Sequence, residues 1–252
     1  MIAGWFEGVG NWFVDLFEKI RFILFEGDRF NHILNGLGNT LLITAGALLI
    51  GIVIGIVVAA IRTSYDKNSE ALKVRGGFGY FIMRLLNGIC KIYLTVIRGT
   101  PVVVQLMIFY FVIFVSAKDG VPVAIFAFGL NSGAYVAEIF RAGIMSIDNG
   151  QFEAGRSLGF NYIQTMWYIV IPQMFKATLP TLCNEFIVLL KETSVAGYVG
   201  VIDLTKAGNI IAGRTFEYFI PLITVALIYL VMVMILTWLV GKLERRLRKS
   251  ER

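Results

Sequence analysis

Two groups of polar residues interrupt apolar parts of this sequence, and their side chains could bind a polar solute. Asn131, Tyr135 and Glu138 are spaced by four and then three residues, which places them on one face of a helix. Thr181, Asn184 and Glu185 form the second group. A charged side chain at the centre of a membrane helix costs about 2.5 to 3.5 kcal/mol on insertion scales, so such residues usually face a cavity or a partner. The two groups are therefore candidate lining residues of a solute pathway.

A structural role for the same carboxylates is an open alternative. Glu138 could pair with Arg141, three residues further along the same helix. Glu185 could meet Lys176 or Arg98 in a packing network. In that case the carboxylates would hold helices together without touching a solute.

Motifs for covalent catalysis and for nucleotide hydrolysis are absent from the sequence. It contains no GxxxxGK[ST] phosphate-binding loop and no GxSxG serine-hydrolase motif. Because His32 is the sole histidine and the two cysteines, Cys90 and Cys183, are far apart, we expect neither a metal site nor a cofactor. The chain is therefore not expected to be an enzyme. Two classes remain: a transporter or channel subunit, and a membrane receptor or scaffold.

The elements that position the polar residues are expected to be membrane helices. Of the 252 residues, 57% are hydrophobic and 16% are charged, and a mean hydropathy of +0.75 is too high for a soluble domain. Spanning a bilayer takes about 20 apolar residues per helix. We predict an all-α integral membrane protein with about five transmembrane helices. The predicted spans are Asn39–Ile61, Pro101–Ser116, Pro122–Ile144, Ala177–Leu190 and Tyr218–Val240.

Three further features accompany these spans. Residues 1–35 are predicted to be an amino-terminal interfacial amphipathic segment that precedes a transmembrane domain at residues 36–243. The segment Phe78–Ile97 mixes charged with apolar residues and is predicted to be an amphipathic lead-in to the second span. Gly51 and Gly55 form a GxxxG motif on the first span, which could pack within the chain or across a dimer.

Basic residues are distributed unevenly among the predicted loops. Sixteen of the 23 Lys and Arg residues fall in residues 62–98, 141–176 and 242–252, and seven fall in the alternate segments. Because cytoplasmic loops carry the excess of positive charge, the amino terminus is expected outside and the carboxyl terminus in the cytoplasm. The basic tail at 244–252 would contact anionic lipid, so the net charge of +6 requires no nucleic-acid partner.

The sequence FEAGRSLGF at residues 152–160 lies between the third and fourth predicted spans and would face the cytoplasm. A helix over Gln151–Leu158 would end at Gly159, which turns the chain back toward the membrane. Glu153 and Arg156 would lie three residues apart along one side. Such a short helix, held between two spans, could move only if the spans move.

This segment resembles the EAA loop of the inner-membrane permease subunits of ATP-binding-cassette (ABC) importers, whose pattern is EAA, three residues, G, nine residues, I, one residue, LP. The matching residues are Glu153, Ala154, Gly159, Ile169 and Pro172. Gly155 replaces the second alanine, and Ile171 replaces the leucine. The glycine would weaken an isolated helix by about 1 kcal/mol relative to alanine.

Four other stretches resemble polar amino acid uptake permeases of the histidine, glutamine and arginine type. They are GLGNTLLIT at residue 36, IRGTPVVVQLMIFYF at 97, NSGAYVAEIFRAGI at 131 and NEFIVLLKETS at 184. With the loop, the similarity covers residues 36–243. It implies a type I ABC importer permease-like bundle in a bacterial inner membrane.

The resemblance also implies partners and site residues. Two permease subunits, either two copies of this chain or this chain with a paralogue, would form the pathway. Two cytoplasmic ABC ATPase subunits would grip the coupling loops at about residues 145–172, and an extracytoplasmic substrate-binding protein would deliver the amino acid. The ATPase-coupling residues would be Glu153, Ala154, Gly155, Leu158 and Gly159, with Ala154 and Leu158 offering apolar contacts.

In this reading, the polar faces at Asn131, Tyr135 and Glu138 and at Thr181, Asn184 and Glu185 would meet the ammonium and carboxylate groups of the amino acid. A receptor or scaffold without transport activity is the alternative, and a gene lacking a neighbouring ATPase and binding protein would favour it. The sequence leaves open which amino acid is carried and whether the binding protein is free or lipid-anchored.

Overall fold

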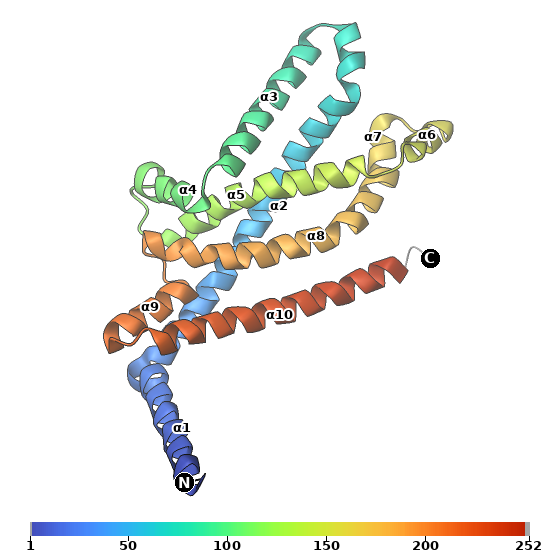
Figure 1. Ribbon diagram of the computed structural model, residues 1–252. Helices are drawn as coiled ribbons and strands as arrows, with labels where there is room; N and C mark the ends of the chain where they lie inside the picture. Colours follow the sequence, from blue (N-terminus) through green and yellow to red (C-terminus); the bar gives the residue numbers. More distant parts are fainter. Residues whose placement is uncertain (1, 250–252) are drawn as a thin grey trace.

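The computed structural model describes residues 2–249, and the side chains of residues 14–247 apart from 68, 71, 72 and 75 (Figure 1). The helices are α1 (Ile2–Phe25), α2 (Arg29–Arg75), α3 (Phe78–Gly99), α4 (Val102–Ile108), α5 (Gly120–Met145), α6 (Asn149–Ser157), α7 (Tyr162–Thr165), α8 (Ile171–Glu192), α9 (Leu204–Thr215) and α10 (Phe219–Lys249). Tighter or wider turns form η1 (Glu26–Asp28), η2 (Phe109–Ile113), η3 (Met166–Val170) and η4 (Thr193–Val199). The described residues contain no strand, which confirms the predicted all-α class.

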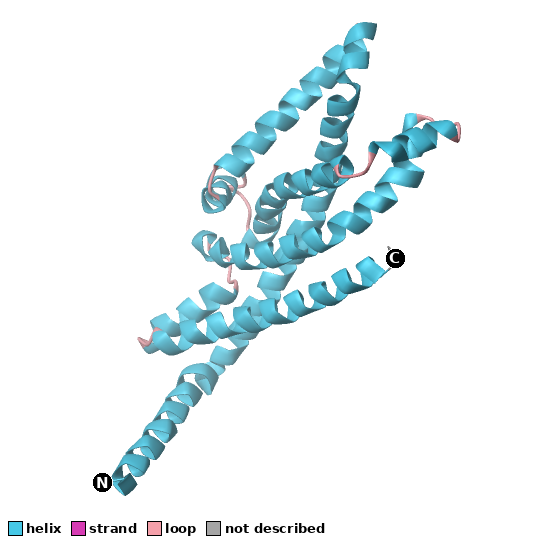
Figure 2. Ribbon diagram, turned by 45° about the vertical axis from the view of Figure 1, so that its right-hand side comes forward, coloured by secondary structure: helices cyan, strands magenta, loops and turns pink. Residues whose placement is uncertain are grey.

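Long helices that run in alternating directions make up the bundle (Figures 1 and 2). By length and composition, α2, α3, α5 and α10 could each cross a membrane. Helix α8 has 22 residues and packs against α2, α5 and α10, but its charged residues lower its hydropathy. The described chain therefore has five long helices in the bundle, in agreement with the expected number.

One of the five long helices differs from the predicted spans. The segment expected to be a lead-in is α3, a helix of 22 residues that folds back on α2. The expected span Pro101–Ser116 is instead α4 and η2, which cover about 18 Å of the roughly 30 Å hydrocarbon core. Thr100 has an extended backbone (φ −120°, ψ 146°), because the ring of Pro101 disfavours a helical residue before it. The proline thus separates a long helix from a short one.

Helices α2 and α5 approach closely where α2 carries its two glycines. A Cβ added to Gly55 would lie 2.5 Å from Val136 Cγ1, and one added to Gly51 would lie 3.1 Å from Ser132 Oγ. Any larger residue at Gly55 would push the helices apart. The GxxxG motif therefore packs within the chain, which decides between the two arrangements that the sequence left open.

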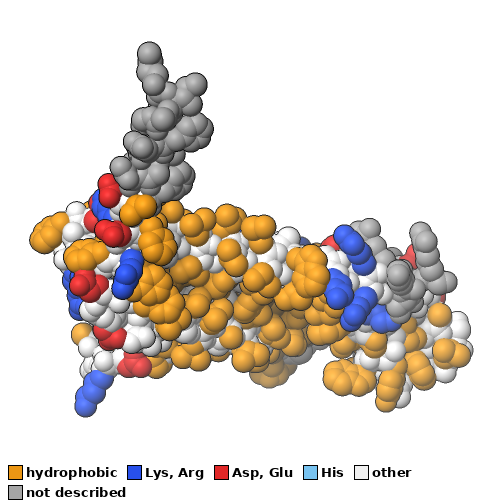
Figure 3. Space-filling view, turned by 90° about the horizontal axis from the view of Figure 1, so that it is seen from below, with side chains coloured by type: hydrophobic (Ala, Val, Ile, Leu, Met, Phe, Trp, Pro, Cys, Tyr) orange, Lys and Arg blue, Asp and Glu red, His pale blue; other side chains and the backbone are white. Residues whose placement is uncertain are grey.

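On the face shown in Figure 3, hydrophobic side chains cover the middle of the bundle, and charged side chains lie at its two ends. One end contains α6, the α2–α3 turn and the end of α10; the other contains η1, η4 and α9 (Figure 1). In the view of Figure 3, Lys and Arg predominate at the α6 end, whereas acidic and basic side chains mix at the other. A continuous apolar band between charged ends is the surface that a bilayer requires.

The amino-terminal helix α1 leaves the bundle at a bend. Gly27 and Asp28 both have positive φ, 62° and 66°, and a side-chain nitrogen of Arg29 donates to the carbonyl oxygen of Phe22 at 2.7 Å. The interfacial role of residues 1–35 and the domain limits stay predictions. Residues 250–252 of the predicted tail lie outside the described residues.

Candidate functional site

Helix α6 forms the short loop helix that the sequence predicts, displaced slightly toward the amino terminus. The Asp148 side chain caps its start by accepting a hydrogen bond from the backbone nitrogen of Gly150 at 2.6 Å. At its end, Gly159 has φ 79°, and the backbone nitrogens of Gly159 and Phe160 donate to the carbonyls of Arg156 and Gly155. This pair of bonds is a Schellman motif, which favours glycine at the left-handed position.

Gly155 has a packing role that its sequence position did not reveal. It is buried, and a Cβ on it would lie 2.6 Å from Thr165 Oγ1 and 2.7 Å from Thr165 Cγ2. Thr165 belongs to α7, is 2% exposed, and donates its hydroxyl hydrogen to the carbonyl of Asn161 at 3.0 Å. The glycine in place of the family's alanine therefore allows α6 to lie directly on α7. We expected only a weaker helix, and the structure adds a compensating close contact.

The side of α6 that packs on the bundle is attached to two long helices. The ammonium of Lys67 on α2 lies 3.4 Å from the centre of the Phe152 ring, and Phe152 packs on the hydrophobic cluster around Val170. The side-chain amide of Gln173 on α8 donates to the side-chain oxygen of Gln151 at 3.1 Å. Movement of α6 would consequently be transmitted to α2 and α8.

A wide turn links α7 to α8. In η3 the backbone nitrogen of Ile171 donates to Met166 five residues earlier, which is the π-helical pattern. Pro172 follows directly, and its ring both lacks an N–H and clashes with the carbonyl four residues before it. The proline of the loop pattern therefore lies where the helix is widened.

The opposite side of α6 is exposed. Glu153 and Ala154 are exposed, Leu158 is 70% exposed, and Ile163 just beyond the turn is 76% exposed. Leu158 belongs to the charged end of the molecule, whereas Ile163 also borders an apolar pocket with Ile56 and Met174. An exposed leucine at a charged end of the molecule is a candidate contact for another protein. We call residues 153, 154, 158 and 163 the α6 surface.

Glu138 and Arg141 form an ion pair on α5. Arg141 Nη2 and Nε both lie 3.1 Å from Glu138 Oε2. Arg98 at the end of α3 lies 3.8 Å from Glu138 Oε1, and Arg141 reaches Asp66 of α2 at 3.8 Å. The pairing within α5 that the sequence suggested is therefore present, and it joins three helices.

Tyr135 and Glu138 also line a polar pocket between α2, α3 and α5. Its volume is about 540 Å³, and the charged residues around it are Arg62, Lys91, Arg98 and Glu138. The guanidinium of Arg98 lies 5.6 Å from the centre of the Tyr135 ring. The sequence singled out Tyr135 and Glu138, but Arg62 and Lys91 were missed because they lie on two other helices.

Asn131 does not line this pocket. It is 3% exposed, and its side-chain amide donates to Gln105 Oε1 on α4 at 3.0 Å. The amide of Gln105 in turn donates to the carbonyls of Ile97 and Thr100 at 2.7 and 3.1 Å. Asn131 and Gln105 thus fix the bend between α3 and α4. Gln105 was missed, although a glutamine inside the run VVVQLM was a signal of buried polarity.

The second predicted group on α8 is divided between two faces. The Glu185 carboxylate accepts a hydrogen bond from the Ser132 hydroxyl on α5 at 2.9 Å, whereas Thr181 and Asn184 are exposed. Glu185 therefore has neither of the basic partners that the sequence suggested. The structure brings Glu185 to α5, but it does not bring α8 into the polar pocket.

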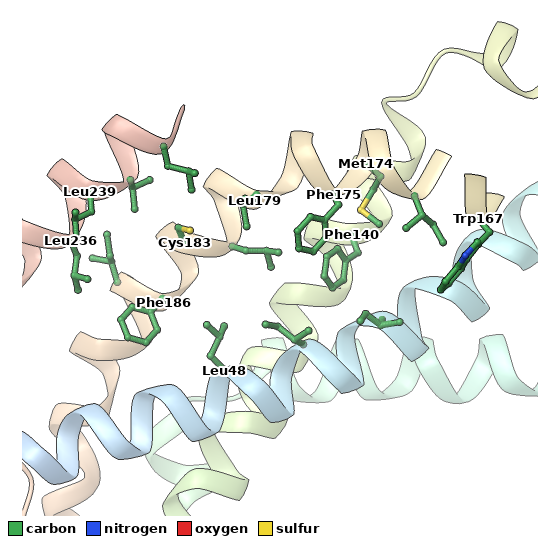
Figure 4. Close-up of a pocket in the computed structure, with 17 residues that line it drawn as sticks. Leu48, Phe140, Trp167, Met174, Phe175, Leu179, Cys183, Phe186, Leu236 and Leu239 are labelled. Carbon is green, nitrogen blue, oxygen red and sulfur yellow. The ribbon is translucent and has the colours of Figure 1, made fainter. Parts of the chain in front are cut away.

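A larger cavity of about 730 Å³ lies between α2, α8 and α10, and only apolar residues line it (Figure 4). Leu48, Phe140 and Met174 point into it, and Leu236 and Leu239 face it from α10 (Figure 4). Without a polar group it could not hold a zwitterion. Of the two cavities, only the smaller polar one has the chemistry of a solute site.

Known proteins resemble this chain over most of its length. Residues 75–249 match the family described as binding-protein-dependent transport system inner membrane component. The arginine transport system permease protein ArtQ of Bacillus subtilis (strain 168) is 38% identical over 222 residues, which cover 87% of this chain and 94% of ArtQ. The putative glutamine transport system permease protein GlnP of Rickettsia bellii (strain RML369-C) is 35% identical over 204 residues, covering 80% and 86%.

A solved structure has the same arrangement of helices. It is described as the crystal structure of an amino acid ABC transporter with histidines, and it superposes with a TM-score of 0.74 at 36% identity. The superposition covers 86% of this chain and 94% of that chain.

Proposed function

The chain belongs to the family of binding-protein-dependent transport system inner membrane components, as a permease of the amino acid ABC transporter type, and on this premise we propose how it works. Two permease subunits form a pathway through the inner membrane, and two cytoplasmic ATPase subunits drive it. A binding protein outside the membrane delivers an amino acid. The amino terminus lies outside, and α6 lies in the cytoplasm.

The α6 surface carries this proposal. It leaves Glu153, Ala154 and Leu158 exposed, while the other side of the same helix contacts α2, α7 and α8. In our mechanism an ATPase groove covers the exposed side. When ATP closes the ATPase pair, α6 follows, and its attachments to α2 and α8 carry the movement into the bundle.

The polar pocket is our candidate for the substrate pathway. Tyr135 and Glu138 are the predicted pathway residues that border it, whereas Asn131 and Glu185 support it from the α4–α5 and α5–α8 contacts. Thr181 and Asn184, exposed on α8, are available to line the path between two subunits. An amino acid would pass this pocket when the bundle opens.

Cysteine cross-linking to the ATPase tests the proposal. In a chain lacking Cys90 and Cys183, Ser157→Cys places a thiol on α6, and Phe216→Cys places a control thiol on another exposed residue, at the opposite end. We expect the ATPase to be captured by the Ser157→Cys variant and not by the Phe216→Cys variant. We also expect the reconstituted complex to take up labelled amino acids when ATP is supplied. Capture through Phe216→Cys instead, or uptake without an ATPase, would overturn the proposal.

A further inference from the structure

The polar pocket holds more positive than negative charge. Arg62, Lys91 and Arg98 border it, and Glu138 is its one carboxylate among the described residues. The three cations come from α2 and α3, whereas the carboxylate comes from α5. The surplus therefore arises only when the three helices come together.

The negative charge of Glu138 is already engaged. Arg141, from outside the pocket lining, lies 3.1 Å from one of its oxygens, and Arg98 lies 3.8 Å from the other. Asp66 is the other carboxylate of this network, and it faces Arg141. Neither carboxylate is left to neutralise Arg62 or Lys91.

Arg62 has an unsatisfied hydrogen-bond donor among the described residues, its side-chain Nε. Its Nε is buried and has no hydrogen-bond partner in the described part of the chain. Among the described residues, no carboxylate lies within ion-pair distance of Lys91 either. Arg62 as a whole is half-buried, and Lys91 and Arg98 are exposed, so their charged groups are accessible to an anionic ligand, with which they would form charge-assisted hydrogen bonds.

The dimensions of the pocket indicate a small ligand. A volume of about 540 Å³ is within the range of small-molecule sites. The ring of Tyr135 forms one wall, and the Arg98 guanidinium lies 5.6 Å from its centre. The main-chain carboxylate and ammonium of an amino acid cancel each other in net charge, so the surplus positive charge must be matched by the side chain.

We propose that the polar pocket selects anionic amino acids, with the side-chain carboxylate between Arg62 and Lys91 and the α-carboxylate near Arg98. This inference rests on the proposed function, because it names the substrate class of that pathway. Glutamate fits these requirements, whereas glutamine has the same shape without the charge. Arginine adds a like charge beside three cations, which is repulsive.

Direct binding to the full-length chain tests this assignment. The purified chain would be placed in nanodiscs of neutral phosphatidylcholine, which keeps anionic head groups out of the assay. Labelled glutamate, glutamine and arginine are then compared at one salt concentration. We expect glutamate to bind at least about tenfold more tightly than glutamine, with arginine the weakest. Lys91→Gln should remove most of this preference, whereas Lys176→Gln on α8, outside the pocket, should leave it unchanged.

The outcomes separate this inference from the proposed function. Equal or tighter binding of glutamine or arginine overturns the charge selection, and so does a glutamate preference that survives Lys91→Gln. Absence of binding by all three removes the pocket as a substrate site. The proposed function fails separately, if the complex with its ATPase moves no amino acid.

Discussion

The α6 surface and the polar pocket both interrupt an apolar chain, but they differ in the kind of group that is left exposed. The pocket exposes charged groups, and the α6 surface exposes apolar ones. Around the pocket, Glu138 and Arg141 are paired with each other and with neighbouring helices, and only a surplus of cations is unmatched. On the α6 surface, Leu158 is 70% exposed at the charged end of the molecule. The pocket is distinguished by excess positive charge, and the α6 surface by exposed apolar area.

This difference separates two kinds of binding by physical cause. Excess positive charge attracts an anion by Coulomb attraction. Uncovered apolar area in water attracts another protein, because its burial releases water. The fastened inner side of α6 and the ion pairs around Arg141 then link the two regions through α2, which takes part in both.

The largest effect is expected for an acidic residue on the α6 surface. Leu158→Asp should weaken ATPase association by about 3 kcal/mol, roughly a hundredfold, because the interface would bury an unpaired carboxylate. Folding should be unaffected, since Leu158 is 70% exposed. Co-purification with the ATPase and ATP-dependent uptake measure the loss. Phe216→Asp, at a residue that is 92% exposed on the opposite end, is the matched control, and an equal loss there would refute the assignment.

The second-largest effect is expected when Glu138 and Glu153, one from each region, are each replaced by glutamine and the free energies of unfolding are compared. Glu138→Gln leaves Arg98 and Arg141 without their shared anion and should lower the free energy of unfolding by about 2 kcal/mol, less than for a fully buried pair. Glu153→Gln on exposed α6 should change it by less than about 0.5 kcal/mol. Thermal denaturation of both variants in one detergent makes the comparison. Equal stability would show that the cluster contributes nothing to folding.

Two separate glutamines, Gln105 and Gln173, should show a smaller difference in the stability that each loses on substitution. Gln105→Leu leaves the Asn131 amide and the carbonyls of Ile97 and Thr100 without these hydrogen bonds. We therefore expect the free energy of unfolding to fall by about 1 to 2 kcal/mol. Gln173→Leu breaks a bond between exposed groups and should cost well under 1 kcal/mol. The two melting temperatures report the difference. A loss for Gln173→Leu as large as that for Gln105→Leu would contradict the buried role of Gln105.

The smallest effect concerns Gly155, and its sign depends on Thr165. In the wild-type background Gly155→Ala should be neutral or destabilising by up to about 1 kcal/mol, because the clash with Thr165 offsets the helix preference for alanine. In a Thr165→Ala background the same change should stabilise by up to about 1 kcal/mol, because the two closest contacts are gone. A double-mutant cycle of thermal stabilities measures this coupling. Identical effects in the two backgrounds would exclude the contact.

Local patterns predicted those features that a few neighbouring residues decide. The apolar runs predicted α2, α5 and α10, and the glycine at 159 predicted where α6 ends, because length, hydropathy and backbone freedom are properties of short segments. The i, i+3 spacing also predicted the Glu138–Arg141 pair. The charged residues within Phe78–Ile97 led us to predict a lead-in there and a span at Pro101–Ser116, whereas the long helix is α3 and Pro101 separates it from the short α4.

By itself, the sequence determined the class of molecule, the α6 loop and the approximate number of long helices, since each follows from contacts within about 20 residues. Only the tertiary structure decided which polar side chains share a pocket. Arg62, Lys91, Arg98 and Glu138 come from three helices, and their distances depend on how closely α2 and α5 approach at Gly55. Electrostatic interactions act through space, so the excess positive charge of the pocket exists only once those helices are packed together.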